Sequence, residues 1–202
     1  IFFCNIYVKI SSRMNILEQI QNYKPYNQQE EKDKEIFIKY LTDFDNCLLR
    51  ENEYGHLCSS AFVLNKERTK IIMIFHNIYQ SWGWVGGHAD GDPDLLHVAI
   101  KEAQEETGLK NIKPISKEIF TLDTLPVQGH IKNGKHVPAH VHLTVAYLLE
   151  ADEKDKVHIK EDENSGVEWV DVNKMTEKST EPFMKYVYDK AIKKMKELGY
   201  IK

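Results

Sequence analysis

Three glutamates, Glu102, Glu105 and Glu106, carry the chemistry that the sequence indicates most strongly. The surrounding residues 95–107 have the apolar spacing of a helix, and positions i, i+3 and i+4 place all three carboxylates on one side of it. Like charges at that spacing repel one another, and a hard divalent cation such as Mg²⁺ or Mn²⁺ would relieve the repulsion. The competing interpretation is a solvated acidic face, which is the usual role of a run of charges.

Both flanks of this helix favour the functional interpretation. A stretch rich in Gly and Asp, residues 81–94, precedes it and is predicted to be a loop. Within this loop the N–H groups of Gly86 and Gly87 are expected to bind phosphate oxygens. Gly108 follows the helix and suits a left-handed C-terminal cap.

Residues 87–109 resemble the Nudix box, whose pattern is G-x5-E-x7-R-E-U-x-E-E-x-G-U with U aliphatic. Gly87 takes the place of the first Gly, Glu102 follows the Arg position, and Glu105 and Glu106 form the E-E pair. The strands and helices predicted around the box also look like the Nudix fold.

The resemblance implies a pyrophosphohydrolase, in which water attacks phosphorus in a nucleoside diphosphate derivative with the help of Mg²⁺ or Mn²⁺. In this interpretation Glu102, Glu105 and Glu106 bind the metal. Glu105 or Glu106 serves as general base, and Glu163, in a later loop, is a further candidate. The substrate would be a small molecule, and a homodimer is a possible assembly.

Two positions depart from the family pattern, since Pro93 stands in place of its first Glu and Lys101 in place of its Arg. We expect the helix to be positioned by a cap instead of a salt bridge. Asp92 would be the N-cap, Pro93 would occupy the first helical position, and Lys101 would be a solvated cation. Asp92→Ala is then expected to cost about 1 kcal/mol of stability.

Histidines form a second group of candidates. His140 and His142 are two residues apart on a predicted strand, so their side chains face the same way. Together with His88 they are expected to contact the substrate, and structural or surface roles remain open. The pair alone does not indicate zinc, because no third ligand follows at a usual spacing.

The predicted elements indicate an α/β (α+β) fold, a Nudix-like mixed sheet sandwiched between helices, with an N-terminal helical extension. Strands are expected at residues 59–64, 70–75, 119–122, 141–149 and 166–170. Besides the glutamate helix, helices are expected within 14–49, broken at 24–26, and at 182–198. The expected organisation is a leader (1–13), a helical segment packed on the domain (14–50) and a Nudix domain (51–202).

Composition narrows the class of protein. The net charge of −4 argues against binding nucleic acid through bulk charge, and no stretch has the length and apolarity of a membrane span. The three cysteines, Cys4, Cys47 and Cys58, form no CxxC pair, which favours a reducing, cytoplasmic compartment.

Two alternatives remain beside the hydrolase. One is an isopentenyl-diphosphate-isomerase-like enzyme, whose chemistry needs a Cys and Glu pair across the substrate. The surroundings of Cys58 do not resemble the isomerase cysteine motif. The other is a degenerate Nudix module that binds a nucleotide without turnover, which the departures at Pro93 and Lys101 favour.

Overall fold

The structure is a computed structural model that describes residues 13–132 and 134–202. The predicted leader therefore lies outside the described residues except for Arg13, which is helical and ion-paired with Asp45. The chain forms two compact units. Unit 1 comprises the residues up to Cys58, His88–Leu95 and Thr121–Val145, and unit 2 comprises Ser59–Gly87, Leu96–Phe120 and Ala146–Lys202.

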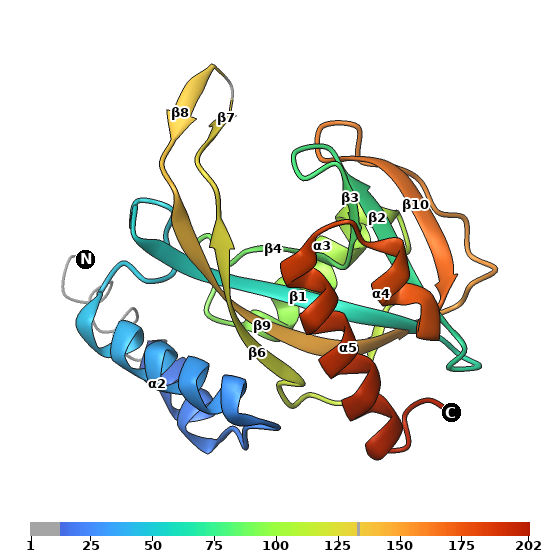
Figure 1. The fold of residues 1–202 in the computed structure, drawn as a ribbon, viewed down its shortest axis with the longest axis horizontal. Helices are drawn as coiled ribbons and strands as arrows, with labels where there is room; N and C mark the ends of the chain where they lie inside the picture. The colour runs from blue at the N-terminus through green and yellow to red at the C-terminus, as the bar shows by residue number, and fades with distance from the viewer. Residues whose placement is uncertain (1–12, 133) are drawn as a thin grey trace. The chain divides into compact units, whose positions relative to one another are not determined.

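A mixed α+β arrangement confirms the predicted fold class (Figure 1). The sheet has the strand order β10-β2-β1-β9-β5, while β3 pairs with β2, β4 with β1 and β6 with β9. Strands β1, β4 and β9 contribute residues to both units. The strand bounds are β1 Gly55–Asn65, β2 Lys70–His76, β3 Ser81–Gly83, β4 Val85–His88, β5 Lys113–Pro114, β6 Thr121–Val127, β9 His140–Ala151 and β10 Asn164–Asp171.

In unit 2, the helices α3 (Leu95–Thr107) and α5 (Pro182–Glu197) accompany the strands, with α5 in front of them and α3 behind them in Figure 1. A 3-10 turn, η1 (Val172–Lys174), and the short helix α4 (Met175–Lys178) connect β10 to α5. The strands predicted at 59–64 and 70–75 and the helix predicted at 182–198 are present as β1, β2 and α5. Pro182 begins α5, at a position where its missing N–H group costs nothing.

Residues 81–83 (β3) and 85–88 (β4) are strand, so the prediction of a loop throughout 81–94 is wrong in its first half. Glycine and aspartate suggested a loop, but Gly86 here permits close pairing. A Cβ on Gly86 would lie 2.6 Å from the Cα of Ser60, on β1. The Trp84 N–H also donates a hydrogen bond to the Tyr188 hydroxyl at 3.0 Å, which ties this segment to α5.

In unit 1, a helix runs through residues 13–22, and α2 (Gln28–Asp43) follows the predicted break. Asn27 caps α2 by accepting a hydrogen bond from the Glu30 N–H. Asp33 of α2 accepts a hydrogen bond from the Thr124 N–H of β6 at 2.9 Å, which fixes the helix against that strand.

One further prediction for unit 1 is corrected. Helix was expected to reach residue 49, but α2 ends at Asp43 and turns follow. The difference arises where the sequence has weak apolar periodicity. Beyond β6, two short strands, β7 (His130–Lys132) and β8 (Lys135–Val137), form an antiparallel hairpin.

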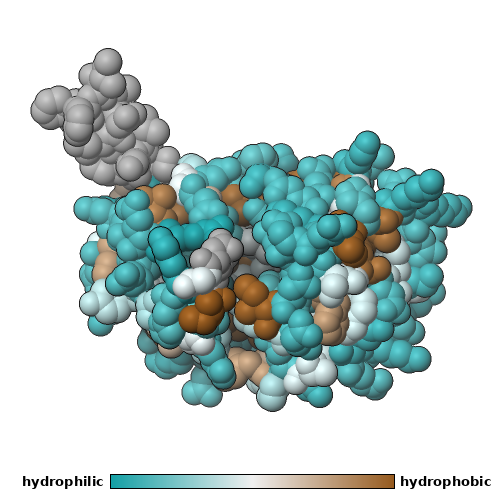
Figure 2. Space-filling view, turned by 90° about the horizontal axis from the view of Figure 1, so that it is seen from above, coloured by the Kyte–Doolittle hydropathy of each residue, from teal (hydrophilic) through white to brown (hydrophobic). Residues whose placement is uncertain are grey.

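The surface is mainly polar on the face drawn in Figure 2, where hydrophilic side chains surround small separate apolar patches. Within the described part of the chain, no helix combines the length and the apolarity needed to span a membrane.

Tyr188→Phe tests the attachment of the Trp84 segment. The variant removes the hydroxyl that accepts a hydrogen bond from the Trp84 N–H, while the fully buried ring stays in place. The donor is part-buried, so we expect a loss of about 0.5–1.5 kcal/mol in the free energy of unfolding, the usual net contribution of a hydrogen bond. Urea denaturation measures it, with the exposed Tyr186→Phe as control. Equal stability of both variants would contradict the role given to this hydrogen bond.

Candidate functional site

The three glutamates of α3 lie on one side of the helix in unit 2, as predicted, but they differ in exposure. Glu106 is only 3% exposed. The side chain of Glu102 is 12% exposed and that of Glu105 is 42% exposed. One carboxylate is therefore fixed in the interior, one lies at the edge, and one faces solvent.

Gly86 and Gly87 make room for two of these carboxylates. The Gly86 N–H donates a hydrogen bond to Glu106 Oε2 at 2.8 Å. A Cβ on Gly87 would lie 2.5 Å from the Cδ of Glu102, so that carboxyl rests directly on the strand backbone. The predicted phosphate contact of the Gly86 N–H is not supported, because the buried Glu106 already uses that donor. Both glycines instead hold α3 against β4.

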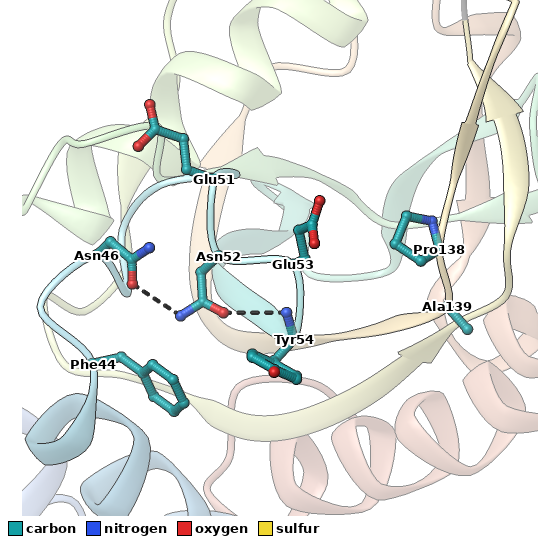
Figure 3. Close-up of a pocket in the computed structure, with 8 residues that line it drawn as sticks. All are labelled: Phe44, Asn46, Glu51, Asn52, Glu53, Tyr54, Pro138 and Ala139. Atoms are coloured by element: carbon teal, nitrogen blue, oxygen red, sulfur yellow. Dashed lines mark hydrogen bonds between the residues drawn. The ribbon is translucent and has the colours of Figure 1, made fainter.

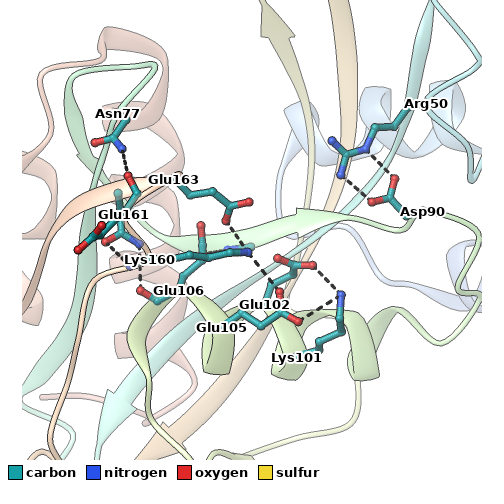
Figure 4. A network of polar contacts seen from close by, with 12 residues as sticks. Arg50, Asn77, Asp90, Lys101, Glu102, Glu105, Glu106, Lys160, Glu161 and Glu163 are labelled. Atoms are coloured by element: carbon teal, nitrogen blue, oxygen red, sulfur yellow. Dashed lines mark hydrogen bonds and ion pairs between the residues drawn. The ribbon is translucent and has the colours of Figure 1, made fainter. Parts of the chain in front are cut away.

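Lys160 joins the solvent-facing glutamate to the candidate base. Its Nζ lies 3.2 Å from Glu105 Oε2 and 3.0 Å from Glu163 Oε2 (Figure 4). Glu163 precedes β10, and its carbonyl oxygen accepts a hydrogen bond from the Asn77 N–H at 2.9 Å. The structure thus brings Glu163 to the glutamates of α3. Sequence reasoning missed Lys160, whose only signal was its position three residues before Glu163.

Lys101 lies at the other edge of the group. Its Nζ is 3.3 Å from Glu102 Oε1 and 3.6 Å from Glu105 Oε1. The side chain is half exposed, as expected of a solvated cation, and these ion pairs add to that expectation. With Pro93 in place of a glutamate, the ammonium pairs with the carboxylates of its own helix.

Burial dominates the electrostatics of the glutamates. It raises the pKa of Glu106 well above its ordinary value, against the hydrogen bond from Gly86 and with the nearby charges of Glu163 and Glu102 adding to the rise. Burial also raises the pKa of Glu102, while Lys101 opposes it. Burial would lower the pKa of Lys160, but its hydrogen bonds to Glu163 and Glu105 raise it. The cluster therefore gains from added positive charge, and its carboxylate oxygens are the donors that hard divalent cations take.

The predicted cap at Asp92 is corrected. Helix α3 begins at Leu95, so Asp94 directly precedes it and Pro93 lies outside the first turn. Asp92 Oδ1 accepts a hydrogen bond from the Asp94 N–H at 2.9 Å, which closes a local turn before the helix. The loss of about 1 kcal/mol expected for Asp92→Ala no longer follows from a helix cap.

The histidines selected from the sequence come together in unit 1. His140 and His142 face the same way, with 3.2 Å between their Nε2 atoms, and His88 Nε2 lies 3.2 Å from His142 Nε2. His56 and Cys58 join them, and sequence reasoning gave neither a place in this group. Burial first, and then the neighbouring imidazoles, lower the pKa of His142 to about 2.

A separate pocket of about 410 Å³ lies in unit 1 (Figure 3). Asn52 hydrogen-bonds Asn46 and the Tyr54 N–H along its wall. Glu51 and Glu53 contribute carboxylates, and none of the described residues that line it is Lys, Arg or His. Its chemistry therefore does not suit a diphosphate.

Glu106→Gln tests the electrostatics of the buried carboxylate in metal-free protein. A raised folded-state pKa means that the unfolded state ionises first, so wild type loses stability as pH rises from the ordinary value of 4.5 toward the folded one. Glutamine keeps an acceptor for Gly86 without titrating. We expect the variant to melt a few degrees higher than wild type at neutral pH, at ~2–4 °C per kcal/mol, with the gap closing below pH ~4.

Calorimetry at several pH values in the presence of a chelator measures this gap, with the exposed Glu118→Gln as control. A difference in melting temperature that does not change with pH would show that burial does not raise the pKa of Glu106.

Comparison with known proteins agrees with this geometry. The NUDIX domain family matches residues 56–191. The curated "Uncharacterized Nudix hydrolase YvcI" of Bacillus subtilis is 26% identical over 138 residues, covering 67% of this chain and 70% of the relative. Similar solved structures include an Ap4A hydrolase of C. elegans (16% identity, 66% of this chain and 93% of that chain, TM-score 0.49) and a NUDIX family hydrolase of Clostridium perfringens (16%, 68% and 96%, TM-score 0.46).

The TM-scores of these structures lie below 0.5, so the assignment to a family rests on the NUDIX domain match. That match spans more than half of the chain and includes the glycines and glutamates described above. Members of this family generally hydrolyse nucleoside diphosphate derivatives and use divalent metal ions. The chain belongs to the Nudix hydrolase family.

Proposed function

We propose that this chain hydrolyses the diphosphate linkage of a small nucleoside diphosphate derivative with Mg²⁺ or Mn²⁺ as cofactor. The observation that carries the proposal is the meeting of Glu105 and Glu163, from different segments of unit 2, on the single ammonium of Lys160. Such a group of carboxylates is more than a solvated helix face, because one of its members comes from outside the helix.

Glu102, Glu105 and Glu106 are the proposed metal ligands, since all three offer carboxylate oxygen and lie on one side of α3. A bound divalent cation polarises phosphoryl oxygens and makes water more acidic. Glu106 holds its place through the Gly86 N–H, and Glu102 rests on Gly87. Lys101 and Lys160 neutralise part of the acidic charge, so the group tolerates both a free and an occupied state.

Glu163 is the general base that we select from the three candidates. Glu105 and Glu106 belong to the metal-binding side of α3, whereas Glu163 approaches from the segment before β10. It keeps a carboxylate free of the helix to take a proton from water. Lys160 positions this carboxylate through its 3.0 Å ion pair and is proposed as a positioning residue.

The alternatives gain little from the structure. The group around Cys58 consists of histidines, not the glutamate that isomerase-like chemistry needs. The alternative of a degenerate binding module has one supporting observation. Lys101, which replaces the Arg of the family pattern, pairs with two of the proposed metal ligands. A cytoplasmic location and a homodimer stay predictions.

Glu105→Gln should lower kcat by a factor on the order of 10² or more, because it removes a proposed metal ligand without removing packing. Phosphate release from a panel of nucleoside diphosphate derivatives, measured first with Mg²⁺ and then with Mn²⁺, reads out the effect. Glu118→Gln, an exposed glutamate outside the group, is the matched control. Unchanged turnover of Glu105→Gln at saturating metal would remove this site, and no turnover of wild type on any substrate would favour the binding module.

Glu163→Gln should lower kcat by about 10²–10⁴-fold, the usual contribution of a general base. A base acts deprotonated, so wild type should lose activity toward acidic pH, and this acidic limb should flatten in the variant. Glu161→Gln, two residues away and exposed, is the control. An unaltered limb in Glu163→Gln would assign the base to a glutamate of α3.

A further inference from the structure

Four potential ligand groups of unit 1 converge outside the glutamate site. Nitrogens of His56, His88 and His142 and the sulfur of Cys58 all lie within 4.8 Å of one another. His56 and Cys58 are only 5% and 4% exposed. We propose that this His₃Cys group is a binding site for a transition-metal ion of the zinc class.

Strand geometry explains why these residues meet. His56 and Cys58 are two apart on β1, so both side chains leave the same face. The Leu57 carbonyl between them accepts a hydrogen bond from the Ala89 N–H at 3.0 Å, which places His88 beside them. On the other side, the Val141 N–H donates to the Tyr54 carbonyl at 3.1 Å and brings His142 of β9 alongside β1.

The segment that carries His88 is held firmly. Arg50 forms a bidentate ion pair with Asp90, in which Nε donates to Oδ1 at 2.7 Å and Nη2 donates to Oδ2 at 2.6 Å (Figure 4). Such paired contacts fix geometry as well as charge. The ligand from β4 is therefore preorganised, as metal sites require.

The ring nitrogens of the clustered histidines make more close contacts than their N–H hydrogens can serve. The His140 Nδ1 lies 2.9 Å from the Pro138 carbonyl oxygen, which can only accept, so that nitrogen carries the hydrogen and Nε2 presents a lone pair. His142 Nε2 contacts both this atom and His88 Nε2 at 3.2 Å, and one hydrogen would have to serve both contacts. Among the residues that the structure describes, the buried Nε2 of His56 has no hydrogen-bond partner. A cation that accepts several lone pairs resolves these deficits together.

The surroundings also orient the ligand atoms. His56 Nδ1 lies 3.5 Å from the Asn52 carbonyl oxygen, so we assign the opposite nitrogen, Nε2, as the metal ligand. Metal-binding histidines usually direct their second ring nitrogen to a carbonyl or carboxylate in this way. His140 contacts His142 but is not one of the four groups, so we assign it a supporting role.

The donor types select the metal. Imidazole nitrogen and thiolate sulfur suit zinc-class ions, whereas Mg²⁺ and Mn²⁺ prefer oxygen. In a tetrahedral zinc site, Zn–N bonds of about 2.0–2.1 Å separate the nitrogens by about 3.3 Å. The 3.2 Å between His88 and His142 already matches this separation. On binding, the Cys58 thiol loses its proton to solvent and the sulfur forms the metal bond.

The experiment titrates the metal-free chain with Zn²⁺ and, separately, with Co²⁺, in excess Mg²⁺ to occupy the glutamates. We expect one tightly bound equivalent of Zn²⁺ and a rise in melting temperature. Co²⁺ should give intense tetrahedral visible bands and a thiolate-to-metal charge-transfer band in the near ultraviolet. The charge-transfer band requires a thiolate ligand, and the glutamate site offers only carboxylates, so the band reports Cys58. This readout does not depend on whether the protein hydrolyses any diphosphate.

Matched variants assign the ligands. Cys58→Ser should abolish the charge-transfer band, while Cys47→Ser, a second buried cysteine, should keep it. His142→Ala should weaken Zn²⁺ binding on the order of 100-fold or more, His140→Ala about 10-fold, and the exposed His136→Ala not at all. Circular dichroism of each metal-free variant separates lost ligands from lost fold. If the variants fail to fold, the Co²⁺ spectrum of wild type alone decides.

Three results would overturn the proposal. They are absence of a bound equivalent of Zn²⁺ in wild type, a Co²⁺ spectrum without a sulfur band, and retention of that band in folded Cys58→Ser. A raised KM in His142→Ala with unchanged Zn²⁺ affinity would instead return the histidines to substrate binding.

Discussion

The close approach of α3 to the backbone at Gly86 and Gly87 is the constraint on which the glutamate site depends. A side chain on either glycine would overlap Ser60 or the Glu102 carboxyl. Because neither glycine has a Cβ, the helix lies against β4, and a backbone N–H reaches the buried Glu106. That hydrogen bond compensates part of the cost of burying a carboxylate. The helix register is thereby fixed, and with it the positions of Glu102 and Glu105.

Once the register is fixed, the three acidic side chains of α3 have different surroundings. Glu106 is buried, Glu102 rests on the strand, and Glu105 reaches solvent, where Lys160 also meets Glu163. The departures from the Nudix pattern fit this arrangement. Without a glutamate at position 93, Lys101 has no partner there and pairs with the acidic side chains next to it.

The two units carry contrasting sets of donor atoms. Unit 2 gathers carboxylate oxygens around α3, and unit 1 gathers imidazole nitrogens and a thiol from β1, β4 and β9. Hard cations prefer the first set and zinc-class ions the second. One chain therefore offers two chemically distinct environments. They arise from the two basic periodicities, since i, i+3, i+4 on a helix and i, i+2 on a strand each align side chains.

Local patterns in the sequence determined the glutamate helix, the β1–β2 hairpin, the break before α2 and the family. Each depends on contacts between residues near in the chain, for which spacing and turn chemistry suffice. Spacing and turn chemistry do not predict which strands pair when those strands are distant in the sequence. The glycines around Gly86 are typical of a loop, but their pairing with β1 makes the segment a strand. His140 and His142 have no further ligand nearby in the sequence, and β1 and β4 supply those ligands in the fold. Lys160 had no motif to mark it. Only the tertiary structure decided these, because sheet register and side-chain convergence are set by long-range packing that no local pattern records.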